Sequence, residues 1–415
     1  MTTTKRKKLI SNTFALSIMQ IVNYLTPLLI MPYLSRIFGI EKFGHLSVLL
    51  SLIVLVSIIT DFGYNLAGTY FIAKNKEKKS LINEYLGTAV LLKTLILILV
   101  ISTICFFTFL GKINSIENNS ILILVNLNII FQAFQFIWFF QGIEKMFNIT
   151  FYTAVGKISY LILVFLFVKD ESLEKVLLFY SVGNFESCFL SFFYIYKEKF
   201  RIMFPKMSRL KTSFKENFFF FLSRVSGNIY STFSIFILGQ ASTYTEAALY
   251  SSSDKLYQGG KSVTNPVTQA IYPYVARTKD TMLVSKFVLR LLVPLIICCG
   301  FFFIFSEKTL TIFYGKSFAD GEKILKVFML TSVVNFIGVN YGYPAFASIS
   351  RVDIVNRSVL YASIAQIIYL SFLYFNKCIN SFNVVIGLLF TETFLSIYRV
   401  VAFITIKRRR EHERV

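Results

Sequence analysis

The chain has 415 residues, of which 55% are hydrophobic and only 16% are charged, and its mean hydropathy is +0.63. Soluble globular chains are about 45–50% apolar and about 25% charged. This composition excludes disordered chains, coiled coils and ordinary soluble enzymes, and it predicts an integral membrane protein.

Long apolar runs alternate with short basic loops along the chain. A helix that crosses the hydrocarbon core needs about 20 mostly apolar residues. The loops are too short to hold a folded soluble domain, so the predicted fold class is all-α and multi-pass. We expect about twelve transmembrane helices, at residues 9–33, 44–66, 84–109, 120–140, 148–168, 175–196, 216–238, 246–272, 284–305, 323–347, 355–375 and 382–406.

Basic residues indicate the orientation. Cytoplasmic loops of membrane proteins carry an excess of Lys and Arg, and here these residues concentrate at both termini and in alternate loops. Both termini are therefore predicted to be cytoplasmic. The formal net charge of +21 is explained by anchors beside an anionic leaflet, so we do not expect nucleic acid as a partner.

A long basic segment divides the predicted helices into two sets of six. It covers residues 197–217 and is expected to be a cytoplasmic linker. The N-terminal lobe would then cover residues 1–196 and the C-terminal lobe residues 218–415. Transporters built from two such halves bind substrate near the bilayer midplane where the halves meet.

Ionisable residues fall within or at the edges of several predicted spans. A central Lys, Arg or Asp costs about 2.5–3.5 kcal/mol on insertion scales. Arg399 is expected to snorkel to the headgroups, and Lys93 either to snorkel or to face a cavity. The others are expected to face a water-filled cavity between the lobes. The remaining cations are Lys157, Arg224, Lys255 and Lys261, and the acids are Asp61, Glu186, Asp254 and Glu392.

Polar residues recur at helical spacing in the same spans. In the eighth span, one face carries Asp254, Gln258, Lys261 and Asn265, at i, i+4, i+7 and i+11. Lone amides usually join helices through hydrogen bonds, whereas a stripe that contains both Asp and Lys favours a cavity. The other amides expected to line this cavity are Gln20, Asn23, Gln132 and Asn228.

Motifs for catalysis or metal binding are absent from the sequence. It has no phosphate-binding G-x-x-x-x-G-K-[ST] loop and no H-E-x-x-H motif, and it contains only two histidines. Its five cysteines lack the spacing of a metal site or a disulfide framework. We therefore expect no cofactor and no metal, and a transporter rather than an enzyme.

Five sequence segments, spread over both halves of the chain, have a recognisable pattern. They are Asn12–Val48, Asp61–Lys74 (DFGYNLAGTYFIAK), Trp138–Met146 (WFFQGIEKM), Asn228–Gly239 (NIYSTFSIFILG) and Asn265–Pro273 (NPVTQAIYP). Together these segments resemble the Wzx-type O-antigen flippases, which belong to the polysaccharide transporter branch of the MOP (MATE-like) superfamily. The resemblance covers both halves in order, and the C-terminal third matches mainly by hydropathy.

The resemblance implies a MATE-like fold of two six-helix lobes in the bacterial inner membrane. The implied activity is alternating-access transfer of an undecaprenyl-pyrophosphate-linked oligosaccharide from the cytoplasmic to the periplasmic leaflet, with an ion gradient coupled through an intramembrane acid. Cations such as Arg224, Lys157 and Lys261 suit its pyrophosphate. A polysaccharide polymerase and a chain-length regulator are the implied protein partners, and membrane lipids surround the chain.

Two other functions remain open at this point. One is a MATE-like exporter of cationic drugs, which the excess of basic over acidic residues within the spans disfavours. The other is a membrane-embedded glycan polymerase, which is a poor fit because the loops are short.

Overall fold

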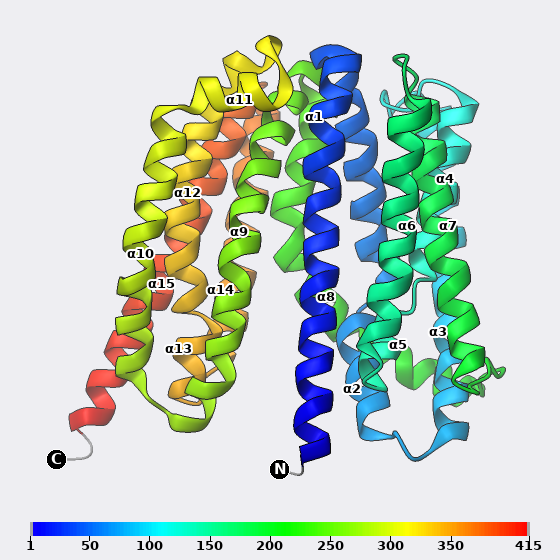
Figure 1. Ribbon diagram of the computed structural model, residues 1–415, viewed down its shortest axis with the longest axis vertical. Helices are drawn as coiled ribbons and strands as arrows, with labels where there is room; N and C mark the ends of the chain where they lie inside the picture. The colour runs from blue at the N-terminus through cyan, green and yellow to red at the C-terminus, as the bar shows by residue number, and fades with distance from the viewer. Residues whose placement is uncertain (1–2, 413–415) are drawn as a thin grey trace. The chain divides into compact units, whose positions relative to one another are not determined.

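The computed structural model describes the backbone of residues 3–412. Within this part every regular element is a helix (Figure 1), which confirms the all-α class. A chain in lipid has to satisfy its backbone groups within each segment, and helices do so. Side chains are described over residues 11–409, with the exception of residues 13, 219, 223–231, 265–267, 269–274, 276 and 283.

Nine helical segments of the described chain are long and apolar enough to cross a membrane. One is the 61-residue segment Phe14–Lys74, which holds two predicted spans. α8 (Met207–Ala241) and α9 (Tyr244–Thr278) have 35 residues each, also enough to cross a bilayer. With the long segment counted as two spans and these two helices included, the helices correspond to the twelve predicted spans. The cytoplasmic placement of the termini stays a prediction.

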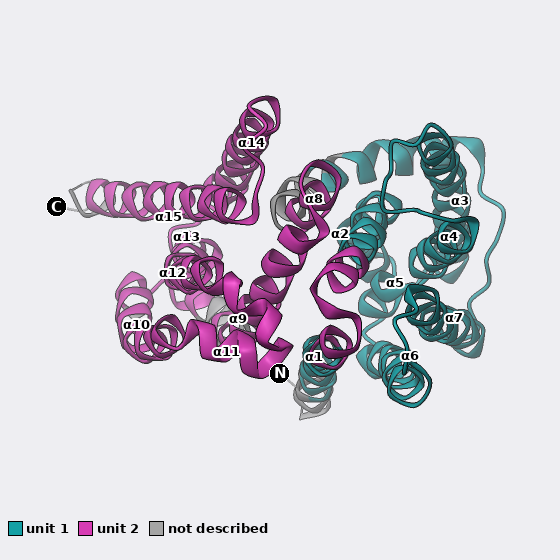
Figure 2. Cartoon of the chain, turned by 90° about the horizontal axis from the view of Figure 1, so that it is seen from above, with its two compact units in different colours: residues 1–30, 48–228 teal, residues 31–47, 229–415 magenta. Residues whose placement is uncertain are grey.

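The described chain forms two compact units (Figure 2). Unit 1 consists of Met1–Ile30 and Val48–Asn228, and unit 2 of Met31–Ser47 and Ile229–Val415. The element α1 (Thr3–Asp61), which consists of two helices that meet at a kink at Gly39, therefore contributes to both units. The predicted division into lobes around residues 197–217 stays a prediction.

Short connections join the helices within each unit. Besides its parts of α1 and α8, unit 1 contains α2 (Tyr64–Lys74), α3 (Lys79–Phe109), α4 (Asn119–Ala133), α5 (Ile137–Gly142), α6 (Met146–Phe167) and α7 (Leu173–Lys197). Unit 2 contains α9, α10 (Thr281–Ile304), α11 (Ser306–Tyr314), the 3-10 helix η1 (Lys316–Gly321), α12 (Glu322–Asn340), α13 (Tyr343–Ser348), α14 (Asp353–Phe375) and α15 (Ser381–His412).

Three of the helices begin where the sequence supplies a polar cap. Asn118, Ser172 and Thr243 each accept a hydrogen bond from the backbone N–H three residues further on. Such a side chain satisfies one of the N–H groups that a helix start leaves without an intrahelical partner. These caps place the starts of α4, α7 and α9.

Aromatic residues form the core of unit 1. Trp138 of α5 is fully buried and lies against Tyr64 and Tyr85, with ring centroids 5.2 and 5.9 Å away. A Cβ added at Gly68 of α2 would lie 2.6 Å from the Trp138 ring. The glycine therefore lets α2 and α5 pack closely. These two helices follow directly after α1 and α4 in the chain.

The segment Met31–Ser47 packs within unit 2 through aromatic contacts and hydrogen bonds. The Phe43 ring lies 5.9 Å from that of Tyr314 and 5.3 Å from that of Phe318, edge to face in both cases. Ser35 donates a hydrogen bond of 2.9 Å to the Tyr314 carbonyl. These contacts explain why this part of α1 belongs to unit 2.

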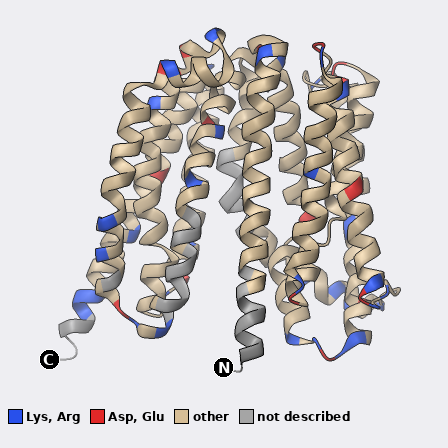
Figure 3. Ribbon diagram, in the orientation of Figure 1, with Lys and Arg blue, Asp and Glu red and all other residues tan. Residues whose placement is uncertain are grey.

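Charged residues lie mainly near the helix ends, as Figure 3 shows. Between those ends the outward faces are apolar: Leu95, Ile98, Leu99 and Phe106 of α3 are all more than half exposed. A soluble protein seldom exposes so large an apolar surface. These side chains are placed to contact acyl chains.

The structure differs from the sequence prediction in the breaks between helices. The predicted span 120–140 is two helices, α4 and α5, with residues 134–136 between them, and the span 323–347 is likewise divided into α12 and α13. The connection after residue 305 contains α11 and η1 rather than an irregular loop. Hydropathy averaged over a membrane span does not detect the breaks at residues 134–136 and 341–342, because each break is only two or three residues long.

Candidate functional site

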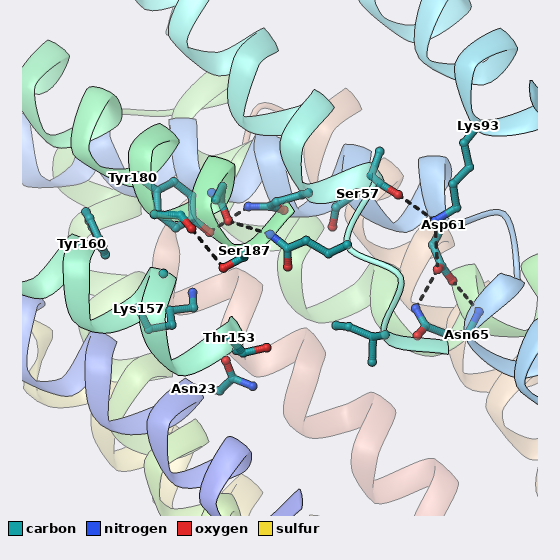
Figure 4. Close-up of a pocket in the computed structure, with 17 residues that line it drawn as sticks. Asn23, Ser57, Asp61, Asn65, Lys93, Thr153, Lys157, Tyr160, Tyr180 and Ser187 are labelled. Carbon is teal, nitrogen blue, oxygen red and sulfur yellow. Dashed lines mark hydrogen bonds and ion pairs between the residues drawn. The ribbon is translucent and has the colours of Figure 1, made fainter. Parts of the chain in front are cut away.

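A polar pocket of about 250 Å³ lies within unit 1, between the helices that the sequence predicts to span the membrane (Figure 4). Among its lining residues only Ala133, Ile137 and two glycines lack a polar side chain. The polar residues are Asn23, Ser57, Asp61, Asn65, Lys93, Gln132, Gln135, Thr153, Lys157, Tyr160, Tyr180, Asn184 and Ser187.

One side of the pocket holds a neutralised ion pair. The Lys93 ammonium lies 3.9 Å from Asp61 Oδ1 and donates a hydrogen bond of 2.8 Å to the Ala133 carbonyl. Asn65 Nδ2 donates to Asp61 Oδ1 at 2.7 Å, as the dashed lines in Figure 4 show. Lys93 and Asp61 are 2% and 7% exposed. At this burial, mutual neutralisation offsets much of the cost of placing either charge in the membrane.

The chain positions Asp61 by ending α1 directly after it. Phe62 and Gly63 both have positive φ, at 46° and 78°, so the helix cannot continue, and α2 begins at Tyr64. A Cβ at Gly63 would lie 2.5 Å from the Asn217 carbonyl oxygen. Glycine therefore meets both the backbone conformation and the close approach of α8 at this turn.

The other side of the pocket is built around Lys157, near the middle of α6. Its ammonium lies 5.4 Å from the centroid of the Tyr180 ring, and it makes no ion pair with the described residues. Tyr180 accepts a hydrogen bond of 2.9 Å from Gln132, and its ring lies 5.1 Å from that of Tyr160. Figure 4 shows Lys157, Tyr160 and Tyr180 together, away from Lys93.

Two hydroxyl groups on this side have no hydrogen-bond partner among the described residues. They belong to Thr153 and Tyr160, and both oxygens are buried. Burying a hydroxyl without a partner is unfavourable by about 1–3 kcal/mol. Such groups are expected to bind water or a ligand that enters the pocket.

Close contact between α6 and α7 fixes the spacing of the groups in this part. Gly156 and Gly183 face each other, and a Cβ at either position would overlap the carbonyl oxygen of the other. Ser187 of α7 donates to the Tyr152 carbonyl of α6 at 3.1 Å. The two backbones are therefore in direct contact beside Lys157.

Amide side chains connect α4 to α7 behind the pocket. Asn184 accepts a hydrogen bond from Gln135 at 3.2 Å and donates to Asn128 at 2.9 Å. Asn128 in turn donates to Ser181 at 2.6 Å. This network uses most of the hydrogen-bonding capacity of the amides, so they act mainly as helix contacts.

The structure brings together part of the predicted site. Asn23, Asp61, Lys93, Gln132 and Lys157 all line the pocket. Two predicted residues of unit 1 do not line it. Gln20 on α1 is half-buried, and Glu186 on α7 is half-buried with one carboxylate oxygen that has no hydrogen-bond partner in the described part of the chain.

The predicted residues of unit 2 lie on two helices. On α9, Gln258 donates to buried Asp254 at 3.2 Å, and the Lys261 ammonium lies 4.7 Å from the Tyr257 ring. Lys255 on the same helix is half-buried. Glu392 on α15 is only 3% exposed. Their place in one cavity shared with unit 1 stays a prediction.

Arg399 is a correction to the sequence prediction, because it does not snorkel. It is 5% exposed, and its guanidinium donates hydrogen bonds of 2.9 Å to Ser358 Oγ and 2.8 Å to the Gly338 carbonyl. A backbone carbonyl and a hydroxyl inside the unit satisfy the cation in place of lipid headgroups. Three other predicted residues have side chains outside the described residues, namely Arg224, Asn228 and Asn265.

Most of the α7 residues that line the pocket are absent from the sequence prediction. Tyr180, Asn184 and Ser187 are spaced at i, i+4 and i+7 and line the pocket together. The spacing criterion that identifies the stripe in the eighth span also detects this one, whereas the prediction names Glu186 on this helix for its charge. Asn65 was also detectable, since it follows Asp61 by four residues.

The described residues contain no group of three or more His, Cys, Asp or Glu side chains that could hold a metal ion. The pocket instead offers ammonium, hydroxyl and amide groups on a rigid helical frame. These groups can bind an oxygen-rich, uncharged or anionic ligand through hydrogen bonds, and they include no assembled nucleophile and base.

Relatives of known description agree with this chemistry. A protein of Shigella dysenteriae, named as a proposed O-antigen transporter, is 25% identical over 401 residues, which cover 94% of this chain and 99% of that protein. A protein of Escherichia coli K12 with the same description is 26% identical and matches 68% of this chain and 70% of its own length.

Solved structures show the same fold. A structure of the lipid II flippase MurJ in an inward closed conformation superposes with a TM-score of 0.74 at 14% identity, over 95% of this chain and 87% of MurJ. A multidrug resistance MATE family transporter of the MOP superfamily, in an inward-facing conformation, has a TM-score of 0.71 at 10% identity, over 95% of this chain and 98% of that one.

The family match, the fold and the apolar helices of the described chain together identify a multi-pass membrane protein. Residues 9–279, well over half of the chain, match the family described as polysaccharide biosynthesis protein. The chain therefore belongs to the polysaccharide biosynthesis protein family and has the fold of the MOP transporter superfamily.

Proposed function

We propose that this transporter is a flippase for undecaprenyl-pyrophosphate-linked oligosaccharides, the repeat units of O-antigen or a similar surface polysaccharide. It moves the glycan headgroup from the cytoplasmic to the periplasmic leaflet by alternating access, while the polyprenyl tail stays in lipid. The family match and the descriptions of the two bacterial relatives support this substrate class.

The observation that carries the proposal is the polar pocket among the membrane helices of unit 1. A glycan headgroup that crosses the bilayer loses its water, and the pocket offers replacement hydrogen bonds from hydroxyl, amide and ammonium groups. Charged and polar residues inside a membrane are costly and usually mark the path of a substrate. An apolar or purely structural bundle has no need of them.

The exporter of cationic drugs is the second candidate, and the MATE fold alone permits it. The charge in the pocket argues against it. Two lysines and one aspartate line the pocket, and the aspartate is paired with Lys93. The remaining cation, Lys157, repels a cationic ligand, so we favour the glycan substrate. The polymerase alternative is set aside because the chain has the fold of solved flippases and transporters and its loops are short.

The proposal also includes coupling to an ion gradient through an acidic residue, and two protein partners. The four candidate coupling acids are Asp61, Glu186, Asp254 and Glu392. Their surroundings differ: Asp61 is paired with Lys93, whereas Asp254 is buried and accepts a hydrogen bond from Gln258. A polymerase and a chain-length regulator stay predicted partners.

Translocation in a reconstituted system tests the proposal. The full chain is placed in vesicles that carry a fluorescent undecaprenyl-pyrophosphate glycan, and a membrane-impermeant quencher reports how much glycan remains in the outer leaflet. We expect the chain to accelerate exchange between leaflets well above protein-free vesicles. A chain that inserts and stays folded but leaves exchange at the protein-free rate, or that exports a cationic dye instead, contradicts the proposal.

A further inference from the structure

The two lysines of the unit 1 pocket differ in how their charges are met. Lys93 is neutralised by Asp61 and bonded to a carbonyl. Lys157 is only half-buried, makes no ion pair with the described residues, and has a tyrosine ring as its contact. An ammonium within a membrane helix is unfavourable by about 2.5–3.5 kcal/mol. Lys157 is therefore the pocket cation that is available to an anion.

Three hydroxyl groups accompany this ammonium. Those of Thr153 and Tyr160 are buried and have no hydrogen-bond partner among the described residues, with the residues themselves 7% and 5% exposed. The Tyr180 oxygen accepts its hydrogen bond from Gln132, so its own O–H proton is free to donate. The Lys157 side thus combines one cation with hydroxyl donors, a set that matches a single oxyanion.

The volume of the pocket and its aromatic lining restrict the kind of ligand that it can bind. A volume of about 250 Å³ is below the roughly 300–1,000 Å³ of sites for drug-sized ligands, so the pocket has room for one sugar ring and not for several. The rings of Tyr160 and Tyr180, with an interplanar angle of 54°, form an inclined wall against which an apolar sugar face can pack. The nearby amide of Asn23 suits ring hydroxyls.

We propose that the Lys157 side of the pocket binds the carboxylate of one acidic sugar in the lipid-linked glycan, which makes Lys157 a specificity-determining residue for repeat units that contain a hexuronic acid. This inference rests on the proposed flippase function and names the class of glycan that the pocket selects.

A pyrophosphate is the other oxyanion of such a substrate, and the pocket suits it less well. A pyrophosphate spreads at least two negative charges over several oxygens, and proteins usually meet it with arginine or several cations. Among the residues whose side chains the structure describes, no arginine lines the pocket, and Lys157 is the one cation without an acidic partner, because Lys93 is already paired. One ammonium with neutral donors corresponds to a single negative charge.

The test compares two lipid-linked glycans that share carrier, pyrophosphate and linkage and differ in one sugar, glucose in one and glucuronic acid in the other. The full chain and its variants are reconstituted in vesicles, and both glycans compete in the same assay. We expect the wild-type chain to favour the glucuronate glycan by about tenfold, equivalent to about 1.4 kcal/mol. Lys157→Gln should lower transfer of that glycan to the rate of the glucose glycan, which itself stays unchanged.

The variants separate the possible outcomes. Lys157→Arg should keep the preference, and Lys112→Gln, at an exposed lysine of the α3–α4 connection, should leave it intact. Equal losses for both glycans in Lys157→Gln would assign the lysine to the shared pyrophosphate and overturn the proposal, as would a wild-type chain without any preference. If the wild-type chain moves neither glycan, the flippase function itself fails.

A second variant covers the case in which Lys157→Gln does not fold. Tyr160→Phe removes only an unpartnered hydroxyl and leaves the packing intact. We expect it to reduce the preference for the glucuronate glycan about two- to fivefold, as the loss of one hydrogen bond does. An unchanged preference in this variant and in Thr153→Val would count against binding on this side of the pocket.

Discussion

Lys93 and Arg399 are buried cations in membrane helices of the two different units. Their surroundings indicate two different roles for a buried cation, one in a pocket wall and one in contacts between helices. Arg399 is bonded to a hydroxyl and a carbonyl and lines no described pocket. Lys93 is bonded to a carbonyl and an acid and forms one wall of a polar pocket. A charge within the membrane is therefore not by itself a sign of a substrate path, because a hydroxyl and a backbone carbonyl of the same unit can hold it.

The largest expected effect is at Lys93. Lys93→Met leaves Asp61 as a buried charge without its partner, which should lower the free energy of unfolding by about 3–5 kcal/mol. The loss of stability is measured as a shift of thermal unfolding in detergent. The double variant Asp61→Asn with Lys93→Met should regain most of the loss, and a double variant as unstable as the single one would contradict the ion-pair interpretation.

A somewhat smaller effect is expected at Arg399. Arg399→Met removes two charge-assisted hydrogen bonds and leaves the Gly338 carbonyl without this donor, so we expect a loss of about 1.5–3 kcal/mol. Because Arg399 lies in the other unit from the pocket, the ratio of the two glycan transfer rates should not change. A change in that ratio without loss of stability would remove the distinction between the two cations.

The contact between α6 and α7 gives a third test. Gly156→Ala places a methyl group against the Gly183 carbonyl, and overpacking of this kind typically lowers stability by about 1–3 kcal/mol. Gly260→Ala is a matched control in a helix, since a Cβ there would meet no atom within 4 Å. Equal stability of the two variants would show that the close approach of α6 and α7 is absent.

The smallest expected effect has the opposite sign. Tyr160→Phe removes a buried hydroxyl that has no partner, so unfolding should need the same free energy or up to about 1 kcal/mol more. The gain in stability would accompany the reduced preference for the acidic glycan described above. A clear loss of stability would indicate that the Tyr160 hydroxyl has a structural partner.

The sequence predicts the helices well because each must be an apolar segment of membrane length. It does not predict which side chains meet. Asp61 and Lys93 are 32 positions apart on different helices, and their pairing depends on the turn at Phe62 and Gly63. Arg399 was wrongly expected to snorkel because its depth along α15 is readable from the sequence, whereas its partners on α12 and α14 are not.

Part of the candidate site was accessible to sequence reasoning in principle. The α7 stripe of Tyr180, Asn184 and Ser187 has helical spacing, but an uncharged stripe is also typical of helix contacts. Only the structure distinguishes the two roles on one helix: Tyr180 lies beside the Lys157 ammonium, while Asn184 bonds to Asn128. A charged residue is easy to identify in a sequence, but the role of a residue depends on the direction in which its side chain points.

The backbone contact at Gly156 and Gly183 has a consequence for motion during transport. Because the two backbones touch at these glycines, rolling or sliding of α6 against α7 would bring their carbonyl groups into collision. We therefore expect the two helices to move together during a conformational cycle. The backbone positions that carry Lys157 and Tyr180 would then keep their spacing from loading to release.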